Sequence, residues 1–258
     1  MLIGISGVAG VGKSTIQWRL SDRFFSPIKY WESSATKKKG WKCTRVPDDA
    51  KTTKDSDIWW CHPDNGNVER FVEELQQLDD YFLAADTVPG NWPLAVDGDI
   101  INENMVGKPI AKNRPIVFFI NGPCLFTCPG LAQCIDHCIY LEANIDHVVL
   151  RRMERNGTKE KLKKAFVASH KEVDWKYGHE LFYETEMKYL RDHNGTHIDA
   201  DCLKDTVYNN VEKVVFKFLS DKGYPSHLWD ELGDASSPAS SSKKHTPVGG
   251  PLVRNIMQ

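Results

Sequence analysis

The chain has 258 residues, of which 41% are hydrophobic and 26% charged, a composition typical of a globular protein with one substantial core. Its formal net charge of −2 provides no basic field that would attract nucleic acid or an anionic membrane. The sequence contains no run of about 18 apolar residues that could span a bilayer. Residues 2–6 have the apolar pattern of a core strand, at the position where a leader peptide would be expected. We therefore expect a cytoplasmic protein whose partner is neither nucleic acid nor a membrane.

The first part of the chain predicts a strand, a loop and a helix. Leu2–Ser6 is a short apolar run that stops at a Gly-rich turn. Ile16, Leu20 and Phe24 then recur at four-residue steps, which is typical of the buried face of a helix. Pro27 ends this pattern, because proline cannot continue a helix.

The rest of the chain predicts alternating strands and helices. Continuous apolar runs at Pro115–Ile120 and Cys138–Leu141 are typical of strands that are buried on both faces. Residues 87–113, rich in Gly, Pro and Asn, are expected to form a long loop. Further strands are expected at Trp41–Val46 and Thr196–Ala200, and helices at Val68–Leu75, Asp146–Arg155, Lys159–Phe166, Leu181–Arg191 and Leu203–Leu219.

This alternation predicts an α/β fold in which a mostly parallel sheet carries helices on both sides, with right-handed crossovers. We expect residues 1–232 to form one domain. From about Gly233 the composition changes to Ser, Pro, Lys and Gly, which predicts a disordered tail over residues 233–258.

A glycine-rich motif lies between the first strand and the first helix. It matches the pattern of the phosphate-binding P-loop at every defined position: Gly7-Val8-Ala9-Gly10-Val11-Gly12-Lys13-Ser14. In such a loop the backbone N–H groups point at phosphate, and the helix N-terminus adds partial positive charge. The motif predicts that residues 7–15, up to Thr15, bind ATP, with Lys13 on the β- and γ-phosphates and the Ser14 hydroxyl on Mg²⁺.

Three segments beyond this loop resemble the uridine kinase and nicotinamide riboside kinase family of P-loop nucleoside kinases. They are Thr44-Arg45-Val46-Pro47-Asp48-Asp49, Trp59-Trp60-Cys61-His62-Pro63-Asp64, and Ile120-Asn121-Gly122-Pro123-Cys124-Leu125-Phe126 followed by Arg151-Arg152-Met153-Glu154-Arg155. The resemblance covers about residues 2–220. It implies a three-layer P-loop NTPase fold with a small lid at about residues 151–175, and transfer of the γ-phosphoryl group of ATP to the 5′-hydroxyl of a nucleoside-like molecule such as nicotinamide riboside or uridine.

The resemblance also implies roles for individual residues. Asp48 is expected to accept the proton of the hydroxyl, with Asp49 beside it. Trp60 and His62 are expected to contact the ribose, and Asn121 stands on the metal side. Arg151, Arg152 and Arg155 are expected to neutralise the charge of the transferred phosphoryl group. For Asp48 the predicted strand supports this role, because ligands of open α/β sheets bind at the carboxyl ends of strands.

Two alternatives stay open. A second acidic pair, Asp79-Asp80, is followed by Tyr81-Phe82 and could supply the base instead, although it follows a helical stretch and not a strand. Asn121 replaces the acid that this family has before Gly122, and Cys61 replaces its ribose-binding Asp. A neutral amide does not attract Mg²⁺ as a carboxylate does, so a nucleotide-binding protein without catalysis is the alternative function.

The seven cysteines are an odd number, which together with the expected location favours reduced thiols. Cys124, Cys128, Cys134 and Cys138 could form a metal site, but their four-residue steps do not match the C-x₂-C pairs of structural zinc. Buried apolar side chains are the preferred interpretation. The sequence does not indicate an oligomeric state.

Overall fold

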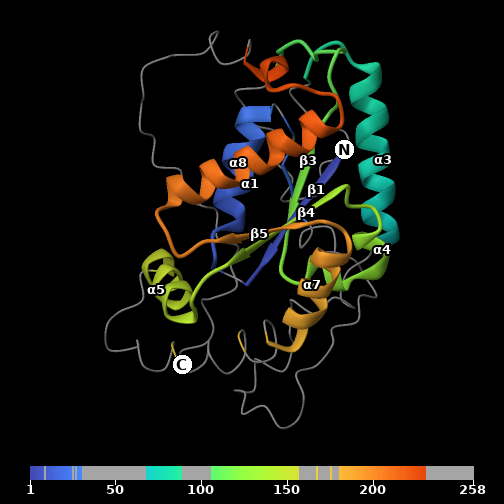
Figure 1. Ribbon diagram of the computed structural model, residues 1–258. Coiled ribbons are helices and arrows are strands. Elements are labelled where there is room, and N and C mark those ends of the chain that lie inside the picture. The colour runs from blue at the N-terminus through green and yellow to red at the C-terminus, as the bar shows by residue number, and fades with distance from the viewer. Residues whose placement is uncertain are drawn as a thin grey trace, which may run out of the picture.

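The structure is a computed structural model that describes residues 1–8, 10–24, 26, 28–30, 68–88, 106–156, 167, 175 and 180–230. Its strands and helices alternate along the chain (Figure 1). They are β1 (Leu2–Gly7), α1 (Lys13–Phe24), β2 (Ile28–Tyr30), α3 (Val68–Ala84), β3 (Phe118–Asn121), η3 (Leu125–Thr127), α4 (Pro129–Ala132), β4 (His137–Glu142), α5 (Ile145–Asn156), α7 (Leu181–Asp192), β5 (Thr196–Asp199), α8 (Lys204–Asp221) and η6 (Ser226–Trp229).

The described strands form one five-stranded sheet in the order β2-β3-β1-β4-β5, and each neighbouring pair is parallel. β1 is central: Ile5 is paired with Asn121 of β3, and Gly7 with Leu141 of β4. All strands therefore end at the same edge. Because the chain leaves β1 toward β2 on one side and leaves β3 toward β4 on the other, the end of β1 lies at a topological switch point of the sheet.

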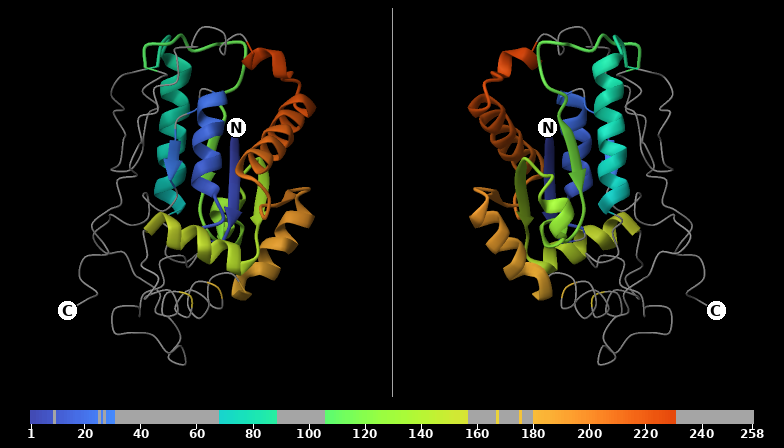
Figure 2. Two further views of the ribbon diagram at one scale, coloured as in Figure 1. Left: turned by 90° about the vertical axis from the view of Figure 1, so that its left-hand side faces the viewer. Right: turned by 90° about the vertical axis from the view of Figure 1, so that its right-hand side faces the viewer.

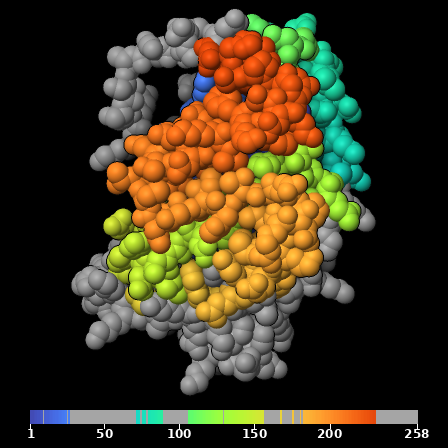
Figure 3. All heavy atoms as spheres, viewed as in Figure 1, coloured from blue at the N-terminus to red at the C-terminus, as the bar shows by residue number. Residues whose placement is uncertain are grey.

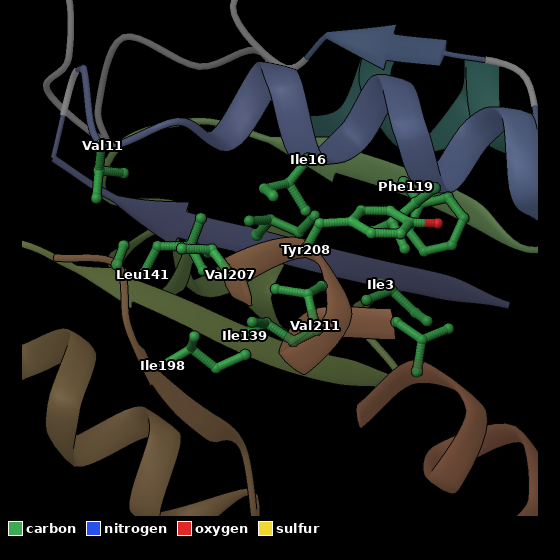
Figure 4. Close-up of a cluster of buried hydrophobic side chains, with 14 of the residues drawn as sticks. Ile3, Val11, Ile16, Phe119, Ile139, Leu141, Ile198, Val207, Tyr208 and Val211 are labelled. Carbon is green, nitrogen blue, oxygen red and sulfur yellow. The ribbon is translucent and has the colours of Figure 1, made fainter. Parts of the chain in front are cut away.

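One core lies between the sheet and the helices α1 and α8. Ile3, Ile5, Phe119, Ile139 and Leu141 point to this side. Figure 4 shows side chains of β1, β4, α1 and α8 meeting there. The helices contribute residues at helical spacing, namely Ile16, Leu20 and Phe24 of α1 and Val207, Val211, Val215 and Leu219 of α8.

A second core lies on the opposite face of the sheet. The alternate strand residues Leu2, Phe118, Ile120, Cys138 and Tyr140 point into it, as the period of two in a strand requires. They pack against Phe71 and Phe82 of α3, Leu125 and Phe126 of η3, Leu131 of α4, and Met187 and Leu190 of α7. Figure 1 accordingly shows α1 on one side of the strands and α3 on the other. The prediction of an α/β fold with a parallel sheet covered on both faces is confirmed.

Several elements differ from the sequence-based prediction. The short strand β2 was not predicted, because three residues directly after Pro27 are too few to show a period. β3 starts at Phe118 and not at Pro115, and it includes Asn121. The helix predicted to end near Leu75 continues to Ala84. The expected strand at 41–46, the helix at 159–166 and the tail at 233–258 lie outside the described residues.

The two ends of the expected long loop are held together. Thr87 forms an antiparallel bridge with Pro109, and Val88 N–H donates to the Lys108 carbonyl at 2.9 Å. Lys112 Nζ donates to the carbonyls of Leu83 and Ala85 at 2.9 and 2.5 Å, which satisfies carbonyl groups at the end of α3. These contacts hold the described residues before and after residues 89–105 next to one another.

The last described segment closes the first core. Trp229 of η6 is fully buried, and its ring meets that of Phe24 edge-on at 5.5 Å between centroids. Arg23 donates to the Trp229 carbonyl at 2.8 Å and to the Asp230 carboxylate at 2.7 Å. The segment after α8 is thus fixed to the end of α1. In the space-filling view α8 and α7 form much of the face toward the viewer (Figure 3).

Within the described ranges, no helix combines the length and the apolar character needed to cross a bilayer.

Three of the cysteines considered above as a metal site, Cys124, Cys128 and Cys138, are buried, as expected. Cys134 is exposed, and its thiol contacts the Gly130 carbonyl.

Candidate phosphate-binding site

The glycine-rich loop leaves the end of β1 and enters α1 at Lys13. It lies at the edge where the neighbouring strands β3 and β4 also end. α5 crosses this edge beside the end of β1 (Figure 2). The loop thus occupies the part of the sheet where α/β folds place their ligands.

Three glycines give the loop its path. Gly7, Gly10 and Gly12 have φ of +136°, +95° and +116°, values that residues with a Cβ rarely adopt. A Cβ at Gly7 would lie 2.3 Å from the Leu141 carbonyl oxygen, and one at Gly10 would lie 2.6 Å from Cγ of Arg152. A Cβ at Gly12 would meet no atom within 4 Å among the described residues other than its chain neighbours. Gly7 and Gly10 are therefore required for packing, whereas Gly12 is required for backbone conformation alone.

The ammonium group of Lys13 is folded back onto the loop. The residue is 7% exposed, and Nζ donates to the carbonyls of Gly7 at 2.6 Å and Val8 at 2.9 Å. Ser14 and Thr15, which follow in the first turn of α1, are exposed. This turn carries no acidic side chain that would neutralise the positive end of the helix dipole. A cation and a helix N-terminus therefore meet in one loop.

Asn121, the expected metal-side residue, lies at the end of β3 next to β1 and is buried. Its amide nitrogen donates to Oε1 of Gln17, and Gln17 Nε2 donates to the Phe119 carbonyl at 2.5 Å. Gln17 lies one turn after Ser14 on α1, so the structure brings the two expected magnesium residues, Ser14 and Asn121, to the same part of the sheet edge. The amide of Asn121 is held by the protein itself through Gln17.

The structure brings two of the three expected arginines to the loop. Arg151 donates through Nη1 to the Val11 carbonyl at 3.3 Å and through Nη2 to the Ala200 carbonyl at 2.7 Å. The aliphatic stem of Arg152 lies against Gly10. Arg155 is exposed near the end of α5. In this structure Arg151 joins α5, the loop and the segment after β5, and its expected role toward phosphate stays a prediction.

The start of α5 is fixed to the same segment. The Asn144 side chain caps the helix by accepting from Asp146 N–H at 2.9 Å. The Asp201 carboxylate accepts from Asn144 N–H at 2.9 and 2.8 Å and contacts His147 Nδ1 at 2.8 Å. These contacts hold α5 in the position from which Arg151 and Arg152 reach the loop.

A buried acid lies behind the loop. Glu186 of α7 is 3% exposed, and its Oε1 accepts from the Ser6 hydroxyl at 2.7 Å and from Phe126 N–H at 3.1 Å. Burial raises the pKa of Glu186 to about 7, while the two hydrogen bonds and the positive charge of Lys13 act in the opposite direction. Glu186 is thus electrostatically linked to the lysine of the loop.

The sequence analysis missed Glu186, although its signal was present. The helix at 181–191 was predicted, and Glu186 occupies its apolar face, three residues after Tyr183 and four before Leu190. A carboxyl group on the apolar face of a helix is rare unless it has buried partners.

The structure does not describe the other expected site residues, which are Ala9, Asp48, Asp49, Trp60 and His62. The alternative pair Asp79-Asp80 lies inside α3, three and two residues before Phe82, whose ring meets that of Phe118, the first residue of β3. The pair therefore does not stand at the carboxyl end of a strand. Within the described ranges no three His, Cys, Asp or Glu side chains gather into a group that could hold a metal ion.

No model of a protein family matches this chain, and no curated protein matches it. The crystal structure of an uncharacterized protein from Eubacterium ventriosum aligns with a TM-score of 0.38 at 12% identity, over 83% of this chain and 97% of that one. A likeness at that level carries no information about chemistry.

Replacing Gly7 by Ala is expected to lower the free energy of unfolding by roughly 3 kcal/mol or more, because it combines a strained φ with a clash on the Leu141 carbonyl. Gly12→Ala is the matched control: it has the strain but no clash, and should cost about 1–2 kcal/mol. Urea unfolding followed by circular dichroism measures both. Equal losses in the two variants would contradict the packing role of Gly7.

Glu186 should make stability depend on pH. Its pKa is higher in the folded protein than in the unfolded chain, so its contribution is fully present below the unfolded value of about 4.5 and is lost as pH rises toward 7. We expect this group to lower the free energy of unfolding by about 2–3 kcal/mol between about pH 5 and about pH 8.

Glu186→Gln should remove that slope, whereas Glu184→Gln, at an exposed position of the same helix, should keep it. Urea unfolding at the two pH values tests this. The same slope in the wild type and in Glu186→Gln would show that Glu186 titrates normally.

Proposed function

We propose that this protein binds ATP with Mg²⁺ in the loop at residues 7–15 and transfers the γ-phosphoryl group to a hydroxyl of a nucleoside-like small molecule. The observation that carries the proposal is the arrangement around Lys13: a buried ammonium group at the start of α1, inside a loop whose positive-φ glycines let the backbone turn closely. This combination of cation, helix N-terminus and glycine loop is suited to a triphosphate.

In this proposal the chain contributes positioning and charge. Lys13 exchanges its bonds to the Gly7 and Val8 carbonyls for phosphate oxygens, while the N–H groups of the first turn of α1 donate to the same anion. The exposed Ser14 hydroxyl would hold Mg²⁺, which neutralises charge on the β- and γ-phosphates. Arg151 and Arg152 hold α5 next to the loop. There Arg151 can replace its hydrogen bond to the Val11 carbonyl by a hydrogen bond to phosphate.

The transfer step requires a hydroxyl in line with the phosphorus. A bond forms between the acceptor oxygen and the γ-phosphorus, and the bond from that phosphorus to the β–γ bridging oxygen breaks, so that ADP leaves. The hydroxyl proton goes to a carboxylate. The family resemblance assigns this role to Asp48, with Asp49, Trp60 and His62 toward the ribose.

A nucleotide-binding protein without catalysis is the second candidate, and Asn121 favours it. At the end of β3, Asn121 donates a hydrogen bond from its side-chain amide to Gln17. The kinases that this sequence resembles have an acidic residue at this position. A neutral amide provides less attraction for Mg²⁺ than a carboxylate. Both candidate functions require nucleotide binding by the loop, and only the kinase also requires transfer of the phosphoryl group.

We expect the purified protein to bind ATP in the presence of Mg²⁺ and to phosphorylate at least one member of a nucleoside panel that includes uridine and nicotinamide riboside. Lys13→Met should weaken binding at least about tenfold and slow turnover about 100-fold or more, because it removes the cation aimed at the transferring phosphate. Lys204→Met, at an exposed position of α8, should leave both unchanged. Binding without any product would favour the second candidate, and absence of binding would reject both.

The base can be assigned by paired substitutions. Asp48→Asn should lower kcat about 100-fold or more with ATP affinity unchanged, because proton removal from the hydroxyl contributes a factor of that order. Asp79→Asn, in α3, should leave kcat unchanged. Steady-state kinetics with the best acceptor measures both, and the reverse result would transfer the role to Asp79.

A further inference from the structure

The carboxyl group of Glu186 lies on the side of the loop that faces the second core. Its Oε1 accepts from Ser6, the residue directly before Gly7, and the carbonyl of Gly7 accepts from Lys13. A short path of contacts therefore runs from the acid, through the end of β1, to the ammonium group. Glu186 also holds η3, because Phe126 N–H donates to it.

The charged and titratable groups that face Glu186 come from several elements. From α1 the positive charge of Lys13 acts on it. From β4 come Cys138 and Tyr140: burial raises the pKa of the Cys138 thiol to about 12 and raises the pKa of Tyr140, and the charge of Glu186 contributes in both cases. Both β4 groups are therefore neutral near pH 7. Lys13 is thus the charged group of the loop that acts on Glu186, although burial and the hydrogen bonds from Ser6 and Phe126 have larger effects on the pKa of this carboxyl group.

A triphosphate in the loop would change the surroundings of Glu186 in two ways. It brings several negative charges to the loop, and it draws the charge of Lys13 toward phosphate. Both changes favour the neutral form of a nearby carboxyl group, because like charges repel and because an opposite charge is lost. In a buried site these effects are weakly screened.

We propose that Glu186 takes up a proton from solvent when a triphosphate binds in the loop, and thereby links nucleotide affinity to pH. This inference rests on the proposed function of the loop. The proton can reside on Oε2, the oxygen that the bonds to Ser6 and Phe126 do not use, so both contacts persist. Glu186 acts as a positioning residue: above about pH 7 it is mainly negative while Lys13 is hydrogen-bonded to the loop carbonyls, and its neutral form becomes more populated when phosphate occupies Lys13.

The proposal fixes the sign of the pH effect. Because binding takes up a proton, affinity falls as pH rises through the range in which free Glu186 loses its proton. If the bound nucleotide raises the pKa of this carboxyl by about one, uptake near pH 7.5 is about half a proton per nucleotide. Affinity for MgATP then falls about fourfold between about pH 7 and about pH 8.5.

Isothermal titration calorimetry of the full chain with MgATP tests this, using two buffers of different ionisation enthalpy at about pH 7.5. The difference in heat gives the number of protons taken up. Glu186→Gln should bind MgATP with uptake close to zero, and the matched exposed variant Glu184→Gln should behave as the wild type. Protonation of MgATP itself is common to all variants and cancels in the comparison.

A second variant keeps the test decisive if Glu186→Gln does not fold. Ser6→Ala removes a bond that stabilises the charged carboxylate, so free Glu186 should hold its proton to higher pH, and uptake should reach its maximum at higher pH than in the wild type. Equal uptake by wild type and Glu186→Gln, or an unshifted maximum in Ser6→Ala, would overturn the proposal. No binding heat in the wild type would instead reject the proposed function.

Discussion

The structure depends on the burial of β1 in the middle of a parallel sheet. Both faces of this strand are covered by apolar side chains, and its neighbours β3 and β4 fix its register. With β1 held in this way, the chain that follows must turn sharply against Leu141, which a side chain at Gly7 would prevent. The loop, the start of α1 and the position of Lys13 all follow from that turn. The candidate site is therefore a consequence of the sheet order and not a separate addition to the fold.

Most of the fold could be predicted from hydrophobic period alone. The strands β1 and β4 and the helices α1, α5, α7 and α8 were expected within a few residues, because each presents a continuous apolar run or a clear helical stripe. β2 could not be predicted, since three residues show no period. The extent of α3 was underestimated because the pair Asp79-Asp80 interrupts its pattern, although acidic residues are well accommodated on the exposed side of a helix.

The site was predictable only where its chemistry follows from local sequence. The glycines and Lys13 form a contiguous motif, so their grouping could be inferred from spacing. Glu186 is 180 residues from Ser6 in the chain, and only the packing of α7 against the second core brings them together. The contacts of Arg151 with Val11 and Ala200 are equally non-local. Residues that act through tertiary contacts give only a weak signal in the local sequence. For Glu186 that signal is an acidic residue on the apolar face of a helix.

The burial of Trp229 determines where the folded part of the protein can be shortened. Its ring packs beside Phe24 in the core, and Arg23 donates a hydrogen bond to the Trp229 carbonyl. A truncation before Trp229 would uncover the end of α1 and remove two partners of Arg23, the Trp229 carbonyl and the Asp230 carboxylate. Shortened proteins for crystallisation or labelling should therefore keep the chain through Asp230, even though η6 is far from the loop in sequence.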